Sequence, residues 1–372
     1  MKTFEEMIRR NHEQVVVGYD RDTGLKAIIA IHNTTLGPAL GGTRMWNYDS
    51  DDDALHDVIR LSRGMTYKAA IAGLNLGGGK GVIIGDSHKG KSEALFRAYG
   101  RLVESLGGRY ITAEDVGTNV RDMEWVRTET SHVCGISKAL GGSGDPSPVT
   151  ARGVYRGIKA CTEEVLGTTS LKGMKVAVQG LGHVGKYLCG FLHNEGAELV
   201  VTDIHQKYID EVVYKYKAEV VAPDKIYETK CDIFAPCALG GILNSETVPK
   251  LRCQIIAGAA NNQLQKESVH GPMLLEQGIW YAPDYVINAG GLINVANEFE
   301  GYNQDRALKQ ADSIYDILKN IIAVAKEENV PTYEASNRLA ERRIEQIGRL
   351  GRKFVPRRPA QFNRNARMID SF

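Results

Sequence analysis

The sequence of 372 residues lacks several features that would place it in a specialised class of protein. It has almost no net charge, with 46 lysines and arginines against 45 aspartates and glutamates, which argues against a general binder of nucleic acid or membrane surfaces. No uninterrupted apolar run approaches the length of a membrane span, and the charged segment 1–10 lacks the apolar core of a signal peptide. The composition is that of an ordinary globular protein long enough for two domains.

Paired cysteines and metal-ligand spacings are also missing. The sequence has no Cys-x-x-Cys pair among its six cysteines, which stand at positions 134, 161, 189, 231, 237 and 253. Most of them lie in apolar contexts, which predicts reduced, buried thiols in a cytoplasmic protein. The nine histidines show no spacing such as His-Glu-x-x-His, so the sequence predicts no metal site.

The most informative stretch that is present is residues 180–185, Gly-Leu-Gly-His-Val-Gly, between a predicted strand and a predicted helix. The first glycine allows a tight turn, the second lets the backbone approach a pyrophosphate, and the third lets helix and strand pack closely. Asp203 follows the third glycine by eighteen residues, at the end of a second predicted strand, where an acid can bind a ribose hydroxyl. The combination predicts a dinucleotide site made by Gly180, Leu181, Gly182, His183, Val184, Gly185 and Asp203. The alternative is a purely structural glycine-rich turn that binds no nucleotide.

Apolar periodicity predicts an α/β domain in the N-terminal third of the chain. A hairpin is expected from two β-branched runs that flank Asp-Arg-Asp-Thr-Gly. The predicted helices are 1–10, 50–62 and 92–106, and the predicted strands are 14–19, 25–32, 81–84 and 109–112. Glycines and prolines interrupt residues 141–148, so no regular element should cross them, and the domain boundary is expected there.

The second part of the chain predicts a parallel, doubly wound sheet, because strands and helices alternate. The predicted strands are 175–179, 199–202, 232–235, 254–257 and 285–287, after a helix at 149–166. Two amphipathic helices, 305–328 and 333–348, are expected to return to the first domain. The expected domains are therefore residues 1–140 plus about 330–372, for substrate and oligomerisation, and residues 149–329, a Rossmann-type domain. The arginine-rich segment 352–372 is either a flexible tail or an arm that grips a neighbouring subunit.

Three charged residues of the N-terminal part stand in unusual surroundings. Three glycines precede Lys80, which predicts either a backbone that passes close to something or a plain turn with a solvated lysine. Lys68 is embedded among apolar residues, which is unusual unless it is paired or functional. Asp115 follows a predicted strand, where a carboxylate suits proton transfer, although a capping role is the alternative. The glycine-dense residues 37–44 are expected to form a loop that presents backbone N–H groups to an anion.

Together these patterns resemble the amino acid dehydrogenase superfamily of glutamate, leucine, phenylalanine and valine dehydrogenases, and most closely its leucine dehydrogenases. The resemblance covers nearly the whole chain and is carried by the motifs at 37–44, 61–68, 77–80, 112–118, 144–150, 180–185, 259–262 and 288–294. Gly81 stands where the family usually has threonine, and Ser87 where it usually has proline. Neither departure removes a chemical group, so both are expected to affect loop rigidity only.

The resemblance implies two domains that close over a cleft and a reversible, NAD-dependent oxidative deamination. A branched-chain L-amino acid would become a 2-oxo acid, with release of ammonia and NADH. Lys80 would be the base that activates water, Asp115 the proton shuttle, and Lys68 the partner of the substrate carboxylate, with backbone near Gly41 and Gly77. A lysine is a base near neutral pH only if its pKa is depressed, for which the ammonium of Lys68 and a dry cleft are the expected causes. Further positions expected from the resemblance to hold nicotinamide or substrate are Ser147, Thr150 and Asn262.

The substrate class follows from a contrast with glutamate dehydrogenases, which place a lysine and a serine around the side-chain carboxylate. Here the matching positions are Leu40 and Val295, and with Met65, Ala113 and Leu292 they predict an apolar pocket that rejects glutamate. The size of Leu292 leaves the choice among leucine, valine, isoleucine and phenylalanine open. The alternatives are therefore a phenylalanine or valine dehydrogenase, or an inactive nucleotide-binding regulator. The resemblance also implies a homo-octamer, while the balanced charge and the lack of a long apolar run predict no nucleic-acid or membrane partner.

Overall fold

The computed structural model describes residues 3–350, so the expectation for the arginine-rich segment 352–372 lies outside the described residues. The described chain divides into two compact units. The first contains the residues up to Thr66, Leu76–Val133 and the residues from Ile347, and the second contains Tyr67–Asn75 and Cys134–Gln346.

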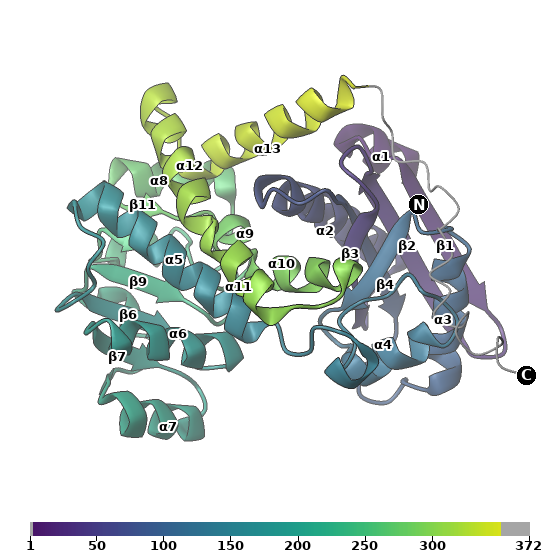
Figure 1. Cartoon of the computed structure of the whole chain (residues 1–372), viewed down its shortest axis with the longest axis horizontal. Coiled ribbons are helices and arrows are strands. Elements are labelled where there is room, and N and C mark those ends of the chain that lie inside the picture. The colour runs from purple at the N-terminus through teal and green to yellow at the C-terminus, as the bar shows by residue number, and fades with distance from the viewer. Residues whose placement is uncertain (1–2, 351–372) are drawn as a thin grey trace, which may run out of the picture. The chain divides into compact units, whose positions relative to one another are not determined.

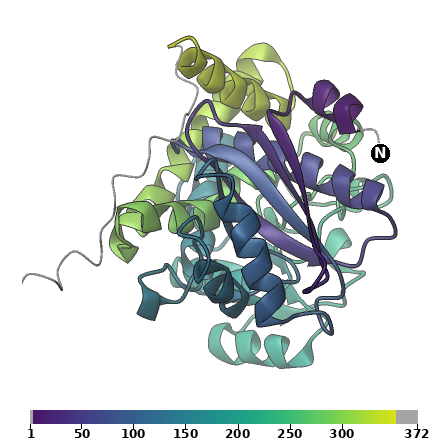
Figure 2. The same ribbon diagram turned by 90° about the vertical axis from the view of Figure 1, so that its right-hand side faces the viewer.

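The first unit is an α/β unit, as the sequence predicts. Its elements are α1 (Thr3–Arg10), β1 (Gln14–Asp20), β2 (Leu25–Asn33), β3 (Ala39–Trp46), α2 (Asp51–Ile71), β4 (Gly77–Ile84), α3 (Glu93–Glu104), β5 (Tyr110–Glu114) and α4 (Val120–Arg127). The strand order is β1-β2-β4-β3-β5, and β3 runs parallel to both of its neighbours. The predicted hairpin is confirmed, because β1 pairs antiparallel with β2 from Gln14 opposite Ile31 to Asp20 opposite Leu25. The α2 and α3 helices cover opposite faces of this sheet (Figure 2).

The glycine run before Lys80 is a strand and not a turn, which corrects the prediction that the strand begins at Gly81. A Cβ on Gly78 would lie 2.1 Å from the backbone nitrogen of Thr66 in α2, and one on Gly79 would lie 2.6 Å from the ring of Tyr110. The glycines therefore let α2 and a tyrosine ring approach the two faces of β4. The 37–44 segment is likewise corrected, because β3 begins at Ala39 and is a buried strand rather than a loop.

The second unit contains the predicted parallel, doubly wound sheet. Its strands are β6 (Lys175–Gln179), β7 (Glu198–Thr202), β8 (Glu219–Val220), β9 (Ile233–Pro236), β10 (Ile255–Ile256) and β11 (Trp280–Tyr281), in the order β11-β10-β9-β6-β7-β8. All neighbouring strands are parallel. This is the Rossmann arrangement, and β6 and β9 flank the point at which the strand order reverses.

Helices cover both faces of this sheet. The helices of the second unit are α5 (Ser147–Leu166), α6 (His183–Asn194), α7 (Gln206–Tyr216), α8 (Glu267–Glu276), α9 (Asp284–Ile287), α10 (Gly290–Ala296), α11 (Gln304–Asp312), α12 (Ile314–Glu328) and α13 (Thr332–Gly348), with short 3₁₀ turns at Lys138–Leu140, Ile226–Glu228, Val248–Lys250 and Asn297–Glu300. Val176 and Val178 of β6 pack in one core with α5, α6 and α12, while Ala177 faces a second core with α8. Figure 1 shows α5 lying along the first of these faces.

Several element boundaries differ from the predictions. Residues 285–287, predicted as a strand, form the short helix α9, because Pro283 precedes it and the Asp284 carboxylate accepts a hydrogen bond from the nitrogen of Tyr285. The last strand is β11, five residues earlier. The single helix expected at 305–328 is two helices, α11 and α12, which meet at Ser313.

The C-terminal helix α13 groups with the second unit rather than with the first, as does the end of α2. The guanidinium of Arg343 donates to the carbonyl oxygens of Ala70, Gly73 and Leu74. These bonds tie residues 67–75 to α13, so both segments differ from the expected domains.

The described residues also bear on membrane-spanning helices and on the cysteines. Among them, no helix combines the length and the apolar character needed to cross a bilayer. The six cysteines are all free, and five of them are buried, as the sequence predicts.

Candidate active site

Lys80 and Asp115 form a largely buried ion pair in the first unit. The Lys80 ammonium lies 2.9 Å from the Asp115 carboxylate, and the lysine side chain is only 6% exposed. The pairing follows from strand register, because β4 and β5 flank β3 and Thr43 of β3 lies opposite both Gly81 and Glu114. Lys80 and Asp115 each adjoin one of these positions, so the sheet brings them together.

A third charged residue, Arg44, completes this cluster and was missed as a partner of the pair. Its Nε lies 3.1 Å from the Asp115 carboxylate, and its Nη1 lies 2.8 Å from Asp57 of α2. The hydroxyl of Tyr48 donates to the same oxygen of Asp57. The sequence offered one signal, since Arg44 ends the glycine-dense segment that was interpreted as an anion-binding loop.

These neighbours shift the pKa values of the pair in useful directions. Burial lowers the pKa of Lys80 below its usual value, and the Arg44 guanidinium lowers it further, although the Asp115 carboxylate opposes both. Burial raises the pKa of Asp115, but the positive charges of Lys80 and Arg44 outweigh it, so that pKa is lowered. A lysine with a depressed pKa beside an ionised carboxylate can take up and pass on protons. The contribution expected from Lys68 stays a prediction.

Other candidate positions of the first unit lie on the same strands. Leu40 and Gly41 are buried in β3, Gly77 begins β4, and Ala113 is buried in β5. Met65 is half-buried in α2. A Cβ on Gly41 would lie 1.7 Å from the carbonyl oxygen of Gly79, so close strand packing already accounts for that glycine.

Lys68 lies in the second unit and its ammonium has a defined partner there. Its Nζ donates to the Asn288 side-chain oxygen at 2.6 Å. The Asn288 amide in turn donates to the side chain of Asn261, at 2.6 Å, and to the carbonyl oxygen of Ala259. Asp284 is also close enough for Lys68 to affect its pKa, which burial raises and this lysine partly lowers. The sequence singled out the Asn288 motif without assigning this role.

The glycine-rich turn has the shape that a dinucleotide requires. Gly180 has a φ of 96°, and a Cβ there would lie 2.7 Å from that of Ala238, so only glycine fits the turn. A Cβ on Gly182 would meet nothing within 4 Å, which leaves open space at the N-terminus of α6. No side chain caps that helix, so its first N–H groups are available to a phosphate.

The acid after β7 lies at the same turn. The Asp203 carboxylate accepts hydrogen bonds from the backbone nitrogens of Leu181, at 2.6 Å, and His205, at 2.8 Å. A Cβ on Gly185 would lie 2.1 Å from the carbonyl oxygen of Gly180. This confirms that the third glycine allows close packing. The remaining residues of the turn are buried at Leu181, half-buried at Val184 and exposed at His183.

The other candidate positions of the second unit lie on its loops and helix ends. Ser147 and Thr150 are buried in the first turn of α5, and the Thr150 hydroxyl donates to the carbonyl oxygen of Pro146. Asn262 is exposed after β10 with a left-handed φ of 52°, a conformation that asparagine tolerates. In α10, Leu292 is 7% exposed and Val295 is half-buried.

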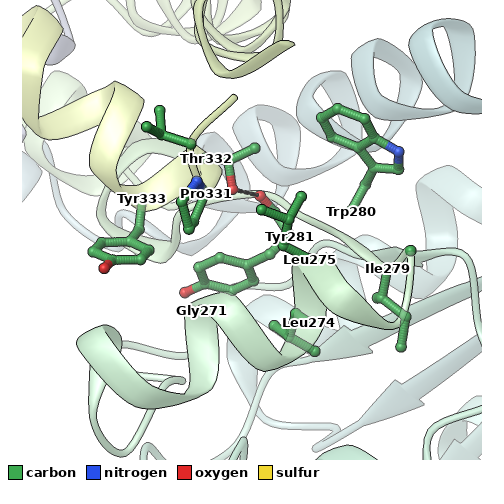
Figure 3. A pocket seen from close by; sticks show the side chains of 11 residues that line it. Gly271, Leu274, Leu275, Ile279, Trp280, Tyr281, Pro331, Thr332 and Tyr333 are labelled. Carbon is green, nitrogen blue, oxygen red and sulfur yellow. Dashed lines mark hydrogen bonds between the residues drawn. The ribbon is translucent and has the colours of Figure 1, made fainter. Parts of the chain in front are cut away.

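A cavity of about 100 Å³ in the second unit lies apart from all of these residues (Figure 3). Apolar and aromatic side chains of α8, β11 and the start of α13 line it, and the Thr332 hydroxyl donates to the carbonyl oxygen of Tyr281. Its lining contains no charged side chain.

The second unit has a Rossmann sheet with an open glycine-rich turn, and the first unit has a buried Lys–Asp pair. Together they are the features expected of a dinucleotide-dependent dehydrogenase. Family comparison agrees with this class. Residues 11–132 match the family described as Glu/Leu/Phe/Val dehydrogenase, dimerisation domain, and residues 141–212 and 199–349 match Glutamate/Leucine/Phenylalanine/Valine dehydrogenase. The chain belongs to this family and is an NAD-dependent amino acid dehydrogenase.

Individual relatives span nearly the whole chain. The chain is 58% identical to leucine dehydrogenase from Thermoactinomyces intermedius over 355 residues, which cover 95% of this chain and 97% of the relative. It is 49% identical to phenylalanine dehydrogenase from Bacillus thermotolerans, over 93% of this chain and 91% of the relative. The crystal structure of L-tryptophan dehydrogenase from Nostoc punctiforme matches with a TM-score of 0.84 and 51% identity, over 93% of this chain and 99% of that one.

Proposed function

We propose that the protein catalyses the reversible, NAD-dependent oxidative deamination of L-leucine and other branched-chain L-amino acids to the 2-oxo acid, ammonia and NADH. The observation that carries the chemistry is the Lys80–Asp115 pair, in which a lysine with a depressed pKa lies 2.9 Å from a carboxylate. The similarity to leucine dehydrogenases, at 58% identity, supports the substrate. The match to amino acid dehydrogenases over nearly the whole chain argues against an inactive regulator.

The proposed roles of the chain's residues follow from charge and position. Lys68 binds the substrate carboxylate, as the family resemblance implies, and Asn288 accepts a hydrogen bond from its ammonium. Lys80, as the neutral amine, removes a proton from the water that attacks the substrate imine. Asp115 moves protons between that amine and the departing ammonia, a role that its contact with Lys80 permits.

The glycine-rich turn and Asp203 fit the coenzyme. The open space at Gly182 and the uncapped N-terminus of α6 suit a pyrophosphate, and Asp203 suits a ribose with free hydroxyls. When bound, NAD supplies a hydride acceptor for the hydrogen on the substrate Cα. We further propose that Ser147, Thr150 and Asn262 contact nicotinamide or substrate.

We expect a strong preference for NAD over NADP, because Asp203 would face the 2′-phosphate and the residues after it, Ile204 and His205, supply no arginine. The measurement is kcat/KM for both coenzymes at saturating leucine. The Asp203→Ser variant should narrow the preference, whereas Asp210→Ser, which removes an exposed acid of α7, should leave it unchanged. Equal kcat/KM with both coenzymes in the unmodified protein would show that Asp203 does not bind the adenosine ribose.

The pH profile should depend on Arg44. Its guanidinium lowers the pKa of Lys80, so its removal in Arg44→Gln raises that pKa and reduces the neutral lysine fraction at a given pH. The alkaline rise of kcat/KM should therefore move to higher pH in Arg44→Gln and stay near its original position in Arg44→Lys, which keeps a cation. If the profile of Arg44→Gln were unshifted, the rise of kcat/KM with pH would not report the deprotonation of Lys80.

The decisive test of the activity is NADH absorbance after addition of NAD and single L-amino acids at alkaline pH. Leucine, valine and isoleucine should be the best substrates. The relatives named for phenylalanine and tryptophan keep an aromatic substrate as the second candidate. No NADH with leucine, valine or isoleucine would contradict the proposed substrate class.

We also propose a cytoplasmic homo-oligomer, with an octamer as the specific expectation. The matched description of the N-terminal family as a dimerisation domain supports self-association. Light scattering of the purified chain measures the subunit number directly, and a monomer would contradict the proposal.

A further inference from the structure

Two of the six cysteines, Cys231 and Cys253, lie side by side at the start of neighbouring strands in the second unit. Lys230 and Arg252 form a parallel bridge, and Ile233 of β9 lies opposite Ile255 of β10. Both pairs are offset by 22 positions, and the two cysteines share that offset, so the register sets them opposite each other.

Their separation suits a disulfide. Adjacent strands lie about 4.8 Å apart, within the Cα–Cα range of roughly 4.4–6.8 Å that a disulfide spans. The backbone nitrogen of Cys231 donates to the carbonyl oxygen of Arg252, which holds the two segments at that spacing. Both side chains belong to the same buried cluster, together with Phe234 and Ile256.

The two thiols also interact directly and differ in character. A hydrogen bond from Cys253 lowers the pKa of Cys231, against the effect of burial, while the same bond and burial raise the pKa of Cys253. Cys231 is therefore the better thiolate, and the thiolate is the reactive form of cysteine.

The other cysteines are poorer candidates. Cys231 and Cys253 are each 9% exposed, whereas Cys134, Cys161 and Cys189 are 0–1% exposed. Cys237 is half-buried, but burial raises its pKa to about 12, which keeps it protonated. Of the six cysteines, Cys231 is therefore the one that combines a lowered pKa with a second thiol directly opposite it.

We propose that Cys231 and Cys253 form a redox-modification site, at which hydrogen peroxide converts the two thiols into a disulfide. The Cys231 thiolate attacks one peroxide oxygen, the O–O bond breaks, and the leaving hydroxide takes a proton to become water. The resulting sulfenic acid is attacked by the Cys253 sulfur, which forms the S–S bond and releases a second water. The two thiols lose two electrons, one peroxide is reduced to two waters, and a small dithiol reverses the change by exchange.

The bond would act as a lock on the coenzyme-binding sheet. It joins the amino ends of β9 and β10, while the glycine-rich turn follows the carboxyl end of β6. Closing the chain between Cys231 and Cys253 restricts the unfolded state, so the oxidised protein should melt a few degrees higher and still bind NADH.

The test is a peptide map of the full-length protein after treatment with a small excess of hydrogen peroxide and alkylation of the remaining thiols. We expect two of six thiols to be lost, a peptide pair joined through Cys231 and Cys253, and full recovery with dithiothreitol. Cys231→Ser and Cys253→Ser should abolish the cross-link, and Cys161→Ser should keep it.

The peptide map of the protein without substitutions is enough to contradict the proposal. A map in which both cysteines remain alkylatable, in which Cys189 and Cys237 are joined instead, or in which Cys231 is only over-oxidised would exclude the site. A lower melting temperature of the cross-linked protein would exclude the lock.

Discussion

The Lys80→Ala variant should lose oxidative deamination by about 10²–10⁴-fold, because it removes the group that activates water. The fold should persist, since the Asp115 carboxylate keeps its ion pair with Arg44. NADH should bind with near-normal affinity, because Lys80 lies in the first unit and the glycine-rich turn in the second. Steady-state kcat and NADH fluorescence titration measure the two effects separately.

A matched control separates the loss of a base from the loss of an ion pair. Lys91→Ala removes the lysine of another pair in the first unit, in which Lys91 lies 2.5 Å from the buried carboxylate of Asp122. Its turnover should stay near that of the unmodified protein. If Lys80→Ala kept more than a tenth of normal turnover, Lys80 would not be the base.

Leucine should be preferred over alanine by roughly 50-fold or more in kcat/KM. Leucine carries three more side-chain carbons, and each buried CH₂ contributes about 0.8 kcal/mol, or about 2.4 kcal/mol together. Phenylalanine should be poor, because the apolar pocket predicted from the sequence is too small for its ring. A panel of leucine, valine, phenylalanine, alanine and glutamate measures the ranking.

The same panel tests the pocket through Leu40. Leu40→Lys puts a charge among apolar groups, so it should weaken leucine use and provide a partner for an acidic side chain, whereas Leu40→Met conserves volume and should change little. Glutamate as the best substrate of the unmodified protein would refute the pocket. Phenylalanine as the best substrate would leave the mechanism intact but overturn the roles of Ala113 and Leu292.

The elements that the sequence predicted well are those whose pattern is long or flanked by strong turn signals. The hairpin of β1 and β2 and the strand Lys175–Gln179 were predicted closely, because alternating or continuous β-branched residues end at glycine-containing turns. The two-residue strands β8 and β11 were not predicted, whereas the equally short β10 lies within the predicted strand 254–257. The apolar residues of α9 resemble a strand until Pro283 and Asp284, which come directly before them, are taken into account.

The sequence singled out residues of the candidate site, but it did not predict all of the contacts between them. Lys80 and Asp115 were chosen for their surroundings in the sequence, and the structure pairs them. Burial is the main cause of the depressed pKa of Lys80, and Arg44 lowers it further. The effect of Arg44 could not be inferred, because it depends on β3 lying between two strands that are distant in sequence. The link from Lys68 to Asn288 likewise joins positions separated by 220 residues.

The glycines of β4 affect how a mutational scan of this protein should be interpreted. A scan that measures only activity would find large losses at Gly78, Gly79 and Lys80 alike and would suggest that all three are catalytic. Since an added methyl at Gly78 collides with the backbone of α2, such variants should fail by lowering the amount of folded protein. Dividing activity by the yield of folded protein would separate residues that perform the reaction from residues that only make room for it.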